Sequence, residues 1–154
     1  MKRLLFVVLA AALLLPFVAG CAVVTPASTV KSPTDGGTPT VTLGIALTAD
    51  DFAADAHPVK DVTLDYDNYF TVTLDANPTT GYQWNSDAVI TGGAVVQVEH
   101  QYQEPTSTLV GAPGKDVWTF RAVRADTATV NFSYARPFES VPPTWTLTLN
   151  VTVK

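Results

Sequence analysis

The chain has 154 residues, of which 47% are hydrophobic and 15% are charged, and its formal net charge is −5. The small charged fraction argues against a disordered chain, and the acidic balance argues against a nucleic-acid-binding protein because phosphate backbones repel a negative surface. The length is enough for one folded domain with additional segments.

Residues 1–20 have the features of a secretory signal peptide. A positively charged start is followed by an apolar run from Leu4 to Leu15 and by small residues before Cys21. The ending Val-Ala-Gly-Cys resembles a prokaryotic lipobox, which implies that Cys21 becomes the new N-terminus and carries a lipid. An ordinary signal peptide is the alternative, and a transmembrane helix is disfavoured because Pro16 interrupts the short apolar run. We therefore expect an extracytoplasmic lipoprotein anchored to a cell membrane.

The composition changes after Cys21, which is the only cysteine and so forms no disulfide within the chain. Residues 22–40 are rich in Thr, Ser, Pro and Gly and have almost no bulky apolar side chains after Val24. Such a segment buries too little surface to offset its ordering entropy. We expect residues 21–40 to be a lipidated N-terminus with a flexible tether, and residues 41–154 to be the folded domain.

Apolar and polar residues alternate along much of the chain from residue 41 onward, as they do in half-buried antiparallel strands. In one such segment, Val96, Val98, His100 and Tyr102 are expected to face the core. A helical turn or two is possible at residues 49–56. The chain is therefore predicted to be all-β, an antiparallel β-sandwich of about seven or eight strands. The clearest strands are predicted at residues 41–47, 62–66, 70–74, 96–102, 118–122, 128–134 and 145–153.

The sequence contains no recognisable catalytic or metal-binding motif. It has no nucleophile elbow; His57 lies in a predicted loop, and His100 is expected to be a hydrogen-bonded structural residue. Two groups of aspartates lack the glycine turn and terminal glutamate of a calcium-binding loop, so we expect them to be exposed carboxylates. These groups are Asp50, Asp51 and Asp55, and Asp61, Asp65 and Asp67. We expect neither an enzyme nor a metal or cofactor site.

The segment from Asn77 to Trp84 is the most informative loop. Pro78 fixes φ at about −65°, and Gly81 permits a positive φ. These residues predict a stiff, uncharged loop tipped by the hydroxyl groups of Thr79 and Thr80. We expect at least one of the two aromatic rings that follow to lie in the core. An ordinary turn between strands is the alternative interpretation.

The same segment resembles the signature loop of the chagasin-like inhibitors of papain-family cysteine peptidases. Two further motifs follow in that family's order: Gly111–Gly114 before an aromatic strand, and Arg136–Phe138 after another strand. The resemblance covers about residues 41–154. Two positions depart from the family pattern, which commonly has glycine where this chain has Pro113 and tryptophan where it has Phe138.

The resemblance implies an immunoglobulin-like sandwich that inhibits papain-like cysteine peptidases reversibly, as a monomer and without a cofactor. The first loop would enter the active-site cleft, and the other two would grip either side. An alternative is a lipid-anchored, immunoglobulin-like surface binding or adhesion module without inhibitory activity. The residues implied to bind the peptidase are Asn77, Pro78, Thr79, Thr80, Gly81, Tyr82, Gly111, Ala112, Pro113, Gly114, Arg136, Pro137 and Phe138.

Overall fold

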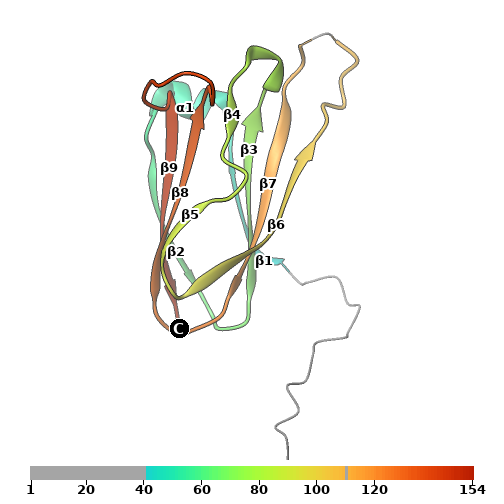
Figure 1. The fold of residues 1–154 in the computed structure, drawn as a ribbon. Coiled ribbons are helices and arrows are strands. Elements are labelled where there is room, and N and C mark those ends of the chain that lie inside the picture. The colour runs from blue at the N-terminus through green and yellow to red at the C-terminus, as the bar shows by residue number, and fades with distance from the viewer. Residues whose placement is uncertain (1–40, 110) are drawn as a thin grey trace, which may run out of the picture. The chain divides into compact units, whose positions relative to one another are not determined.

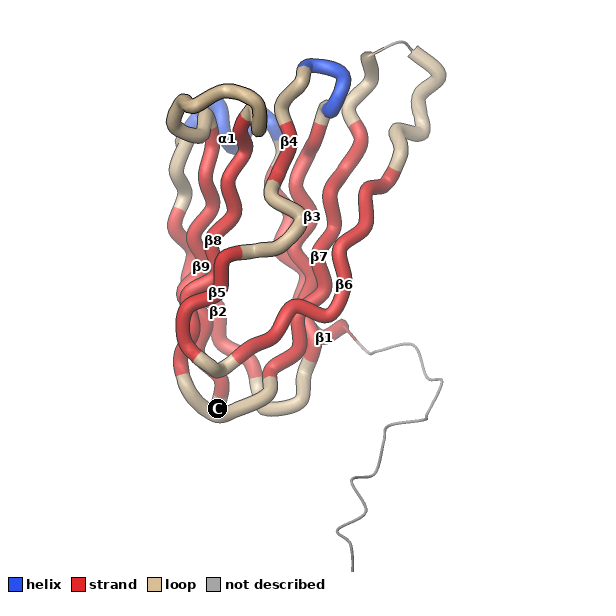
Figure 2. Tube along the Cα trace, in the orientation of Figure 1, coloured by secondary structure: helices blue, strands red, loops and turns tan. Residues whose placement is uncertain are grey.

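A computed structural model describes residues 41–109 and 111–154. The predicted signal peptide, Cys21 and the predicted tether lie outside the described residues. The described part contains nine strands, one α-helix and one 3-10 helix, and Figures 1 and 2 show the strands running lengthwise in two layers. No helix in it is long and apolar enough to cross a membrane.

The strands form two sheets that face each other. The first sheet has the order β1 (Val41–Leu47), β3 (Tyr69–Ala76), β7 (Gly114–Ala122) and β6 (Val95–Gln103). The second has β2 (Val59–Leu64), β9 (Trp145–Val153) and β8 (Thr127–Ala135), with β4 (Gln83–Trp84) and β5 (Val89–Gly92) both paired to β8. The all-β sandwich is therefore confirmed, while β4 and β5 are too short to have shown an alternating pattern.

Two of the strand pairings are parallel, and the others are antiparallel. β1 pairs with β3, and β2 pairs with β9, in parallel registers. The cause lies in the path of the chain. After β1 the chain crosses to the second sheet to form β2 and then returns for β3, so β1 and β3 run in the same direction. The sandwich is thus mainly antiparallel with one parallel pairing at an edge of each sheet.

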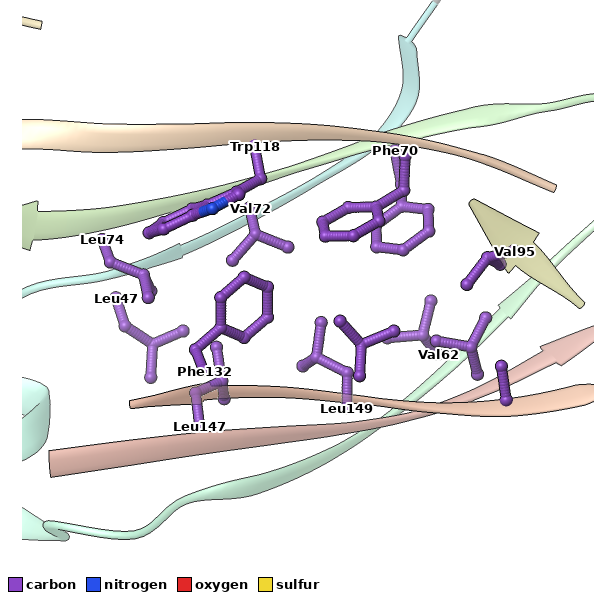
Figure 3. Close-up of a cluster of buried hydrophobic side chains, with 14 of the residues drawn as sticks. Leu47, Val62, Phe70, Val72, Leu74, Val95, Trp118, Phe132, Leu147 and Leu149 are labelled. Atoms are coloured by element: carbon purple, nitrogen blue, oxygen red, sulfur yellow. The ribbon is translucent and has the colours of Figure 1, made fainter. Parts of the chain in front are cut away.

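The core fills the space between the two sheets. Figure 3 shows Trp118 and Phe70 from the first sheet directed toward Phe132 and Leu149 from the second. The rings of Trp118 and Phe132 meet edge to face with centroids 4.9 Å apart, and both side chains are buried. The indole nitrogen of Trp118 also donates a hydrogen bond to the carbonyl oxygen of Ser86, so no polar atom of this ring is left without a partner.

The short helix α1 (Ala49–Ala54) confirms the helical turns expected at residues 49–56. Thr48 is its N-cap, and Thr48 and Asp51 satisfy each other's backbone N–H groups in a capping box. Hydrogen bonds from the backbone and side chain of Thr48 lower the pKa of Asp51. Phe52 is buried and packs against Trp84 and Trp145, so α1 closes the core at the end of the sandwich where the proposed binding loops lie.

The prediction for β6 is wrong in part. Val96 and Val98 are 44% and 53% exposed, instead of facing the core. The ladder between β6 and β7 skips Val98, which makes a β-bulge between Gln97 and Glu99. Because of the extra residue, odd-numbered side chains of β6 face the core before the bulge and even-numbered side chains face it after the bulge. The His100 side chain therefore points inward, as predicted, and its Nε2 atom lies 2.8 Å from Asp116 Oδ1.

Candidate functional site

Three loops that carry the motifs found in the sequence lie at one end of the sandwich (Figures 1 and 2). The first loop (residues 77–82) joins β3 to β4, the second (residues 104–109 and 111–113) belongs to the connection from β6 to β7, and the third (residues 136–144) joins β8 to β9. They meet because β3, β6 and β8 all run toward this end, which we call the loop end.

The first loop is a single turn of 3-10 helix, Pro78–Thr80, closed by Gly81. The backbone N–H of Gly81 donates to the carbonyl oxygen of Pro78 over 2.9 Å, and Gly81 has a φ of 81°. A side chain at this φ would be strained, which explains why glycine stands here. The loop is therefore fixed by its own backbone.

The two hydroxyl groups at the tip of the first loop are already engaged within it. The hydroxyl of Thr79 donates to Asn77 Oδ1 over 2.6 Å, and the hydroxyl of Thr80 donates to the carbonyl oxygen of Asn77 over 2.7 Å. Both threonines are exposed. Since each hydroxyl has only one proton, these groups face solvent as hydrogen-bond acceptors.

Aromatic side chains attach the first loop to the core. The backbone N–H of Asn77 donates to the hydroxyl oxygen of Tyr134 over 3.2 Å. Trp84 is buried, and its indole nitrogen donates to the carbonyl oxygen of Asp75. Tyr82 is half-buried and stacks on Tyr134 with centroids 5.6 Å apart. The expectation that at least one of the rings of Tyr82 and Trp84 lies in the core is confirmed.

A hydrogen bond from Asn77 Nδ2 to the carbonyl oxygen of Gly111, over 3.0 Å, joins the second loop to the first. Gly111 has a φ of 80° with open space around it, and Pro113 is exposed. Gly114 differs from its neighbours because it is the buried first residue of β7, where a Cβ atom would collide with Gln103 and the Tyr102 hydroxyl. Gly114 therefore shapes the second loop without being exposed on it.

The third loop packs against the first. The ring of Phe138 lies over Gly81, so that a Cβ atom at Gly81 would be 3.3 Å from Phe138 Cζ. Phe138 is nevertheless 73% exposed. The guanidinium carbon of Arg136 lies 4.5 Å from the centroid of the Tyr82 ring, and Arg136 forms an ion pair of 2.9 Å with Glu139. Sequence reasoning missed Glu139 because it lies outside the three-residue motif.

A hollow of about 490 Å³ opens beside the first and third loops, between β4 and β6. Pro78 and Pro137 contribute to its rim, and His100 and Asp116 line it. Burial raises the pKa of Asp116, and the hydrogen bond and charge of His100 oppose this effect. The sequence carried a signal for Asp116, because it shares the inward face of β7 with Trp118. The described residues hold no group of three or more side chains suited to a metal ion.

The comparison with known families matches most of the folded part. The family described as "Chagasin family peptidase inhibitor I42" matches residues 63–153. Chagasin from Trypanosoma cruzi is 31% identical to this chain over 90 residues, which are 54% of this chain and 78% of that protein. The family match over residues 63–153 includes all three loops.

Solved structures with a similar fold include a cysteine protease inhibitor and a protein in complex with falcipain-2. The cysteine protease inhibitor EhICP2 from Entamoeba histolytica has a TM-score of 0.59, with 20% identity over 73% of this chain and 96% of its own. PbICP-C in complex with falcipain-2 gives 0.56, with 16% identity over 72% of this chain and all of its own. Amebosin gives 0.52, with 23% identity over 72% and 98%. These similarities show the fold.

Proposed function

This chain belongs to the chagasin family of peptidase inhibitors, and we propose that it is a reversible inhibitor of papain-like cysteine peptidases. The observation that carries the proposal is that three motif-bearing loops lie together at one end of the sandwich. The first loop would enter the active-site cleft, with the second and third loops on either side. PbICP-C, which has the same fold, was solved in complex with falcipain-2.

The chemistry of the first loop suits such a cleft. Residues 77–82 carry no charged side chain. A papain-like site holds a thiolate beside an imidazolium. An uncharged loop buries no unpaired ion there, and the two threonine hydroxyls offer acceptor oxygens to donors in the cleft. No covalent bond to the peptidase is required.

The connections among the three loops support tight binding. The first loop is linked to the second by the bond from Asn77 to Gly111 and to the third by the contact between Gly81 and Phe138. Loops that already hold their bound shape lose little conformational entropy on association. The exposed Phe138 ring supplies apolar area of the kind that dominates interfaces.

The location of the inhibitor is part of the same proposal. We propose that Cys21 carries lipid and that residues 21–40 tether the domain to a membrane outside the cytoplasm. Intact-mass measurement of the membrane-extracted protein should give a lipid-modified chain beginning at Cys21. Unmodified Cys21 would contradict the anchor and leave the inhibitor proposal intact.

The decisive experiment is titration of papain with the protein, with residual activity measured on a small fluorogenic substrate. We expect activity to be abolished at near-stoichiometric ratios and recovered on dilution, as for a reversible inhibitor. An adhesion module would leave the activity unchanged, and this outcome across several papain-like enzymes would reject the proposed function.

A further inference from the structure

The Arg136 side chain, which belongs to the third loop, contacts the first loop through its guanidinium face and a residue of its own loop through an edge nitrogen. Its guanidinium plane lies over the Tyr82 ring, and its Nη1 atom donates to Glu139 Oε1 over 2.9 Å. The backbone strengthens this arrangement, because the N–H of Glu139 donates to the carbonyl oxygen of Arg136. Glu139 is thus placed by the turn that it helps to close.

The Nε atom of Arg136 is buried and has no hydrogen-bond partner among the described residues. It lies 3.9 Å from the position that a Cβ atom would take at Gly81. The guanidinium is therefore pressed against the first loop at Gly81 and Tyr82 without a polar bond to it. An arginine fixed only by stacking would be free to rotate away, so its orientation depends on the carboxylate at its outer end.

We infer that Glu139 is a positioning residue for the first loop: it holds Arg136 against Tyr82 and Gly81, and so fixes the loop that would enter the cleft. This inference rests on the proposed function. On this inference, the effect of Glu139 on inhibition passes through Arg136 and needs no contact between Glu139 and the peptidase.

A double-mutant cycle tests the route of the effect. Glu139→Ala should weaken inhibition of papain about two- to fivefold, the range of an exposed ion pair, by raising the dissociation rate. The same substitution in an Arg136→Ala background should cause no further loss. Equal losses in both backgrounds would mean that Glu139 contacts the peptidase directly, and an unchanged inhibition constant for Glu139→Ala would mean that it has no role. Either result overturns the inference.

A nuclear magnetic resonance experiment provides a readout without a peptidase. The buried Nε–H of Arg136 should exchange slowly with water and be shifted upfield by the Tyr82 ring. Glu139→Ala should abolish both properties, while Glu99→Ala, at an exposed position of β6, should keep them. An unchanged signal in Glu139→Ala would overturn the inference. If the wild-type protein inhibits no papain-like enzyme, the proposed function fails while this spectrum still decides the position of Arg136.

Discussion

The side-chain amide of Asn77 donates to the carbonyl oxygen of Gly111 over 3.0 Å, and its Oδ1 atom accepts the hydroxyl proton of Thr79. One side chain thereby connects the first loop to the second and also fixes the tip of the first. Because this bond spans 34 residues of sequence, it restrains two loops that the strands alone would leave independent.

Asn77→Ala should therefore weaken inhibition of papain about tenfold, since it removes a bond worth about 1 kcal/mol and releases the loop tip. The unfolding midpoint should fall only slightly, because the lost bonds are exposed. Asn150→Ala is the matched control, as it removes an exposed asparagine bond to Asp61 on the second sheet. Equal inhibition by Asn77→Ala and the wild type would show that the connection between loops is not used in binding.

Thr80→Glu should weaken inhibition about a hundredfold or more, because an unpaired carboxylate would be forced into a desolvated cleft beside a thiolate. Thr80→Gln has nearly the same size without the charge, so the difference between the two variants isolates the electrostatic cost. Both lose the exposed bond from the Thr80 hydroxyl to Asn77, so the unfolding midpoints of the two variants should fall equally and only slightly.

The measurement for Thr80 is a pair of values for each variant, the unfolding midpoint and the inhibition constant. Trp118→Ala is a control with the opposite expectation. It removes a fully buried side chain and should lower the free energy of unfolding by about 3–5 kcal/mol, so it should reduce inhibition only by unfolding the domain. A folded Thr80→Glu variant that inhibits as well as the wild type would remove the first loop from the interface.

Phe138→Ala should weaken inhibition about tenfold or more, as expected when an exposed aromatic side chain that becomes buried on binding is removed. Phe138→Trp should strengthen it about two- to threefold, because the larger ring adds area and an N–H donor. Val59→Ala, at an exposed apolar position of β2, controls for the general loss of surface area. An unchanged inhibition constant for Phe138→Ala would exclude the third loop from binding.

The stability of the domain should depend on the ionisation of Asp116. Burial raises its pKa above the ordinary value of 3.8, so the folded protein binds this proton more tightly than the unfolded chain does. The resulting stabilisation is complete below pH 3.8 and is lost as the pH rises through the pKa of the folded state. Asp116→Asn removes this titration and keeps an oxygen acceptor for His100.

As the pH rises above 3.8, the unfolding midpoint of Asp116→Asn should therefore increase relative to that of the wild type. Urea unfolding at a series of pH values measures this difference directly. A difference that stays constant with pH would mean that the carboxyl group titrates alike in the folded and unfolded chains.

The long strands were predictable because their alternation is set by burial on one face, as in Phe70, Val72 and Leu74. The bulge in β6 was not, because Val96 and Val98 are apolar and resemble inward-facing residues until the pairing with β7 is known. Sequence alternation records which residues suit a core, whereas a bulge is decided by the register between two strands.

The candidate site was predictable as three separate motifs but not as one connected surface. The sequence placed Asn77 and Gly81 in a stiff turn because proline and glycine restrict the backbone locally. The bond to Gly111 and the packing of Phe138 on Gly81 join segments far apart in the sequence, so only the tertiary fold creates them. Glu139 escaped notice for a different reason, because it lies just outside the three-residue motif, three positions from Arg136.

The bulge at Val98 also bears on how the folded domain avoids aggregation. β6 is one of the two outer strands of its sheet, and two of its valines are exposed, a combination that favours pairing with a strand of another chain. The bulge interrupts the regular spacing of backbone groups and increases the local twist, so an incoming strand cannot match the edge over its full length. Removing Val98 would restore a regularly spaced edge that still exposes Val96, and a variant without this residue should form soluble oligomers or precipitate at concentrations where the wild type stays monodisperse.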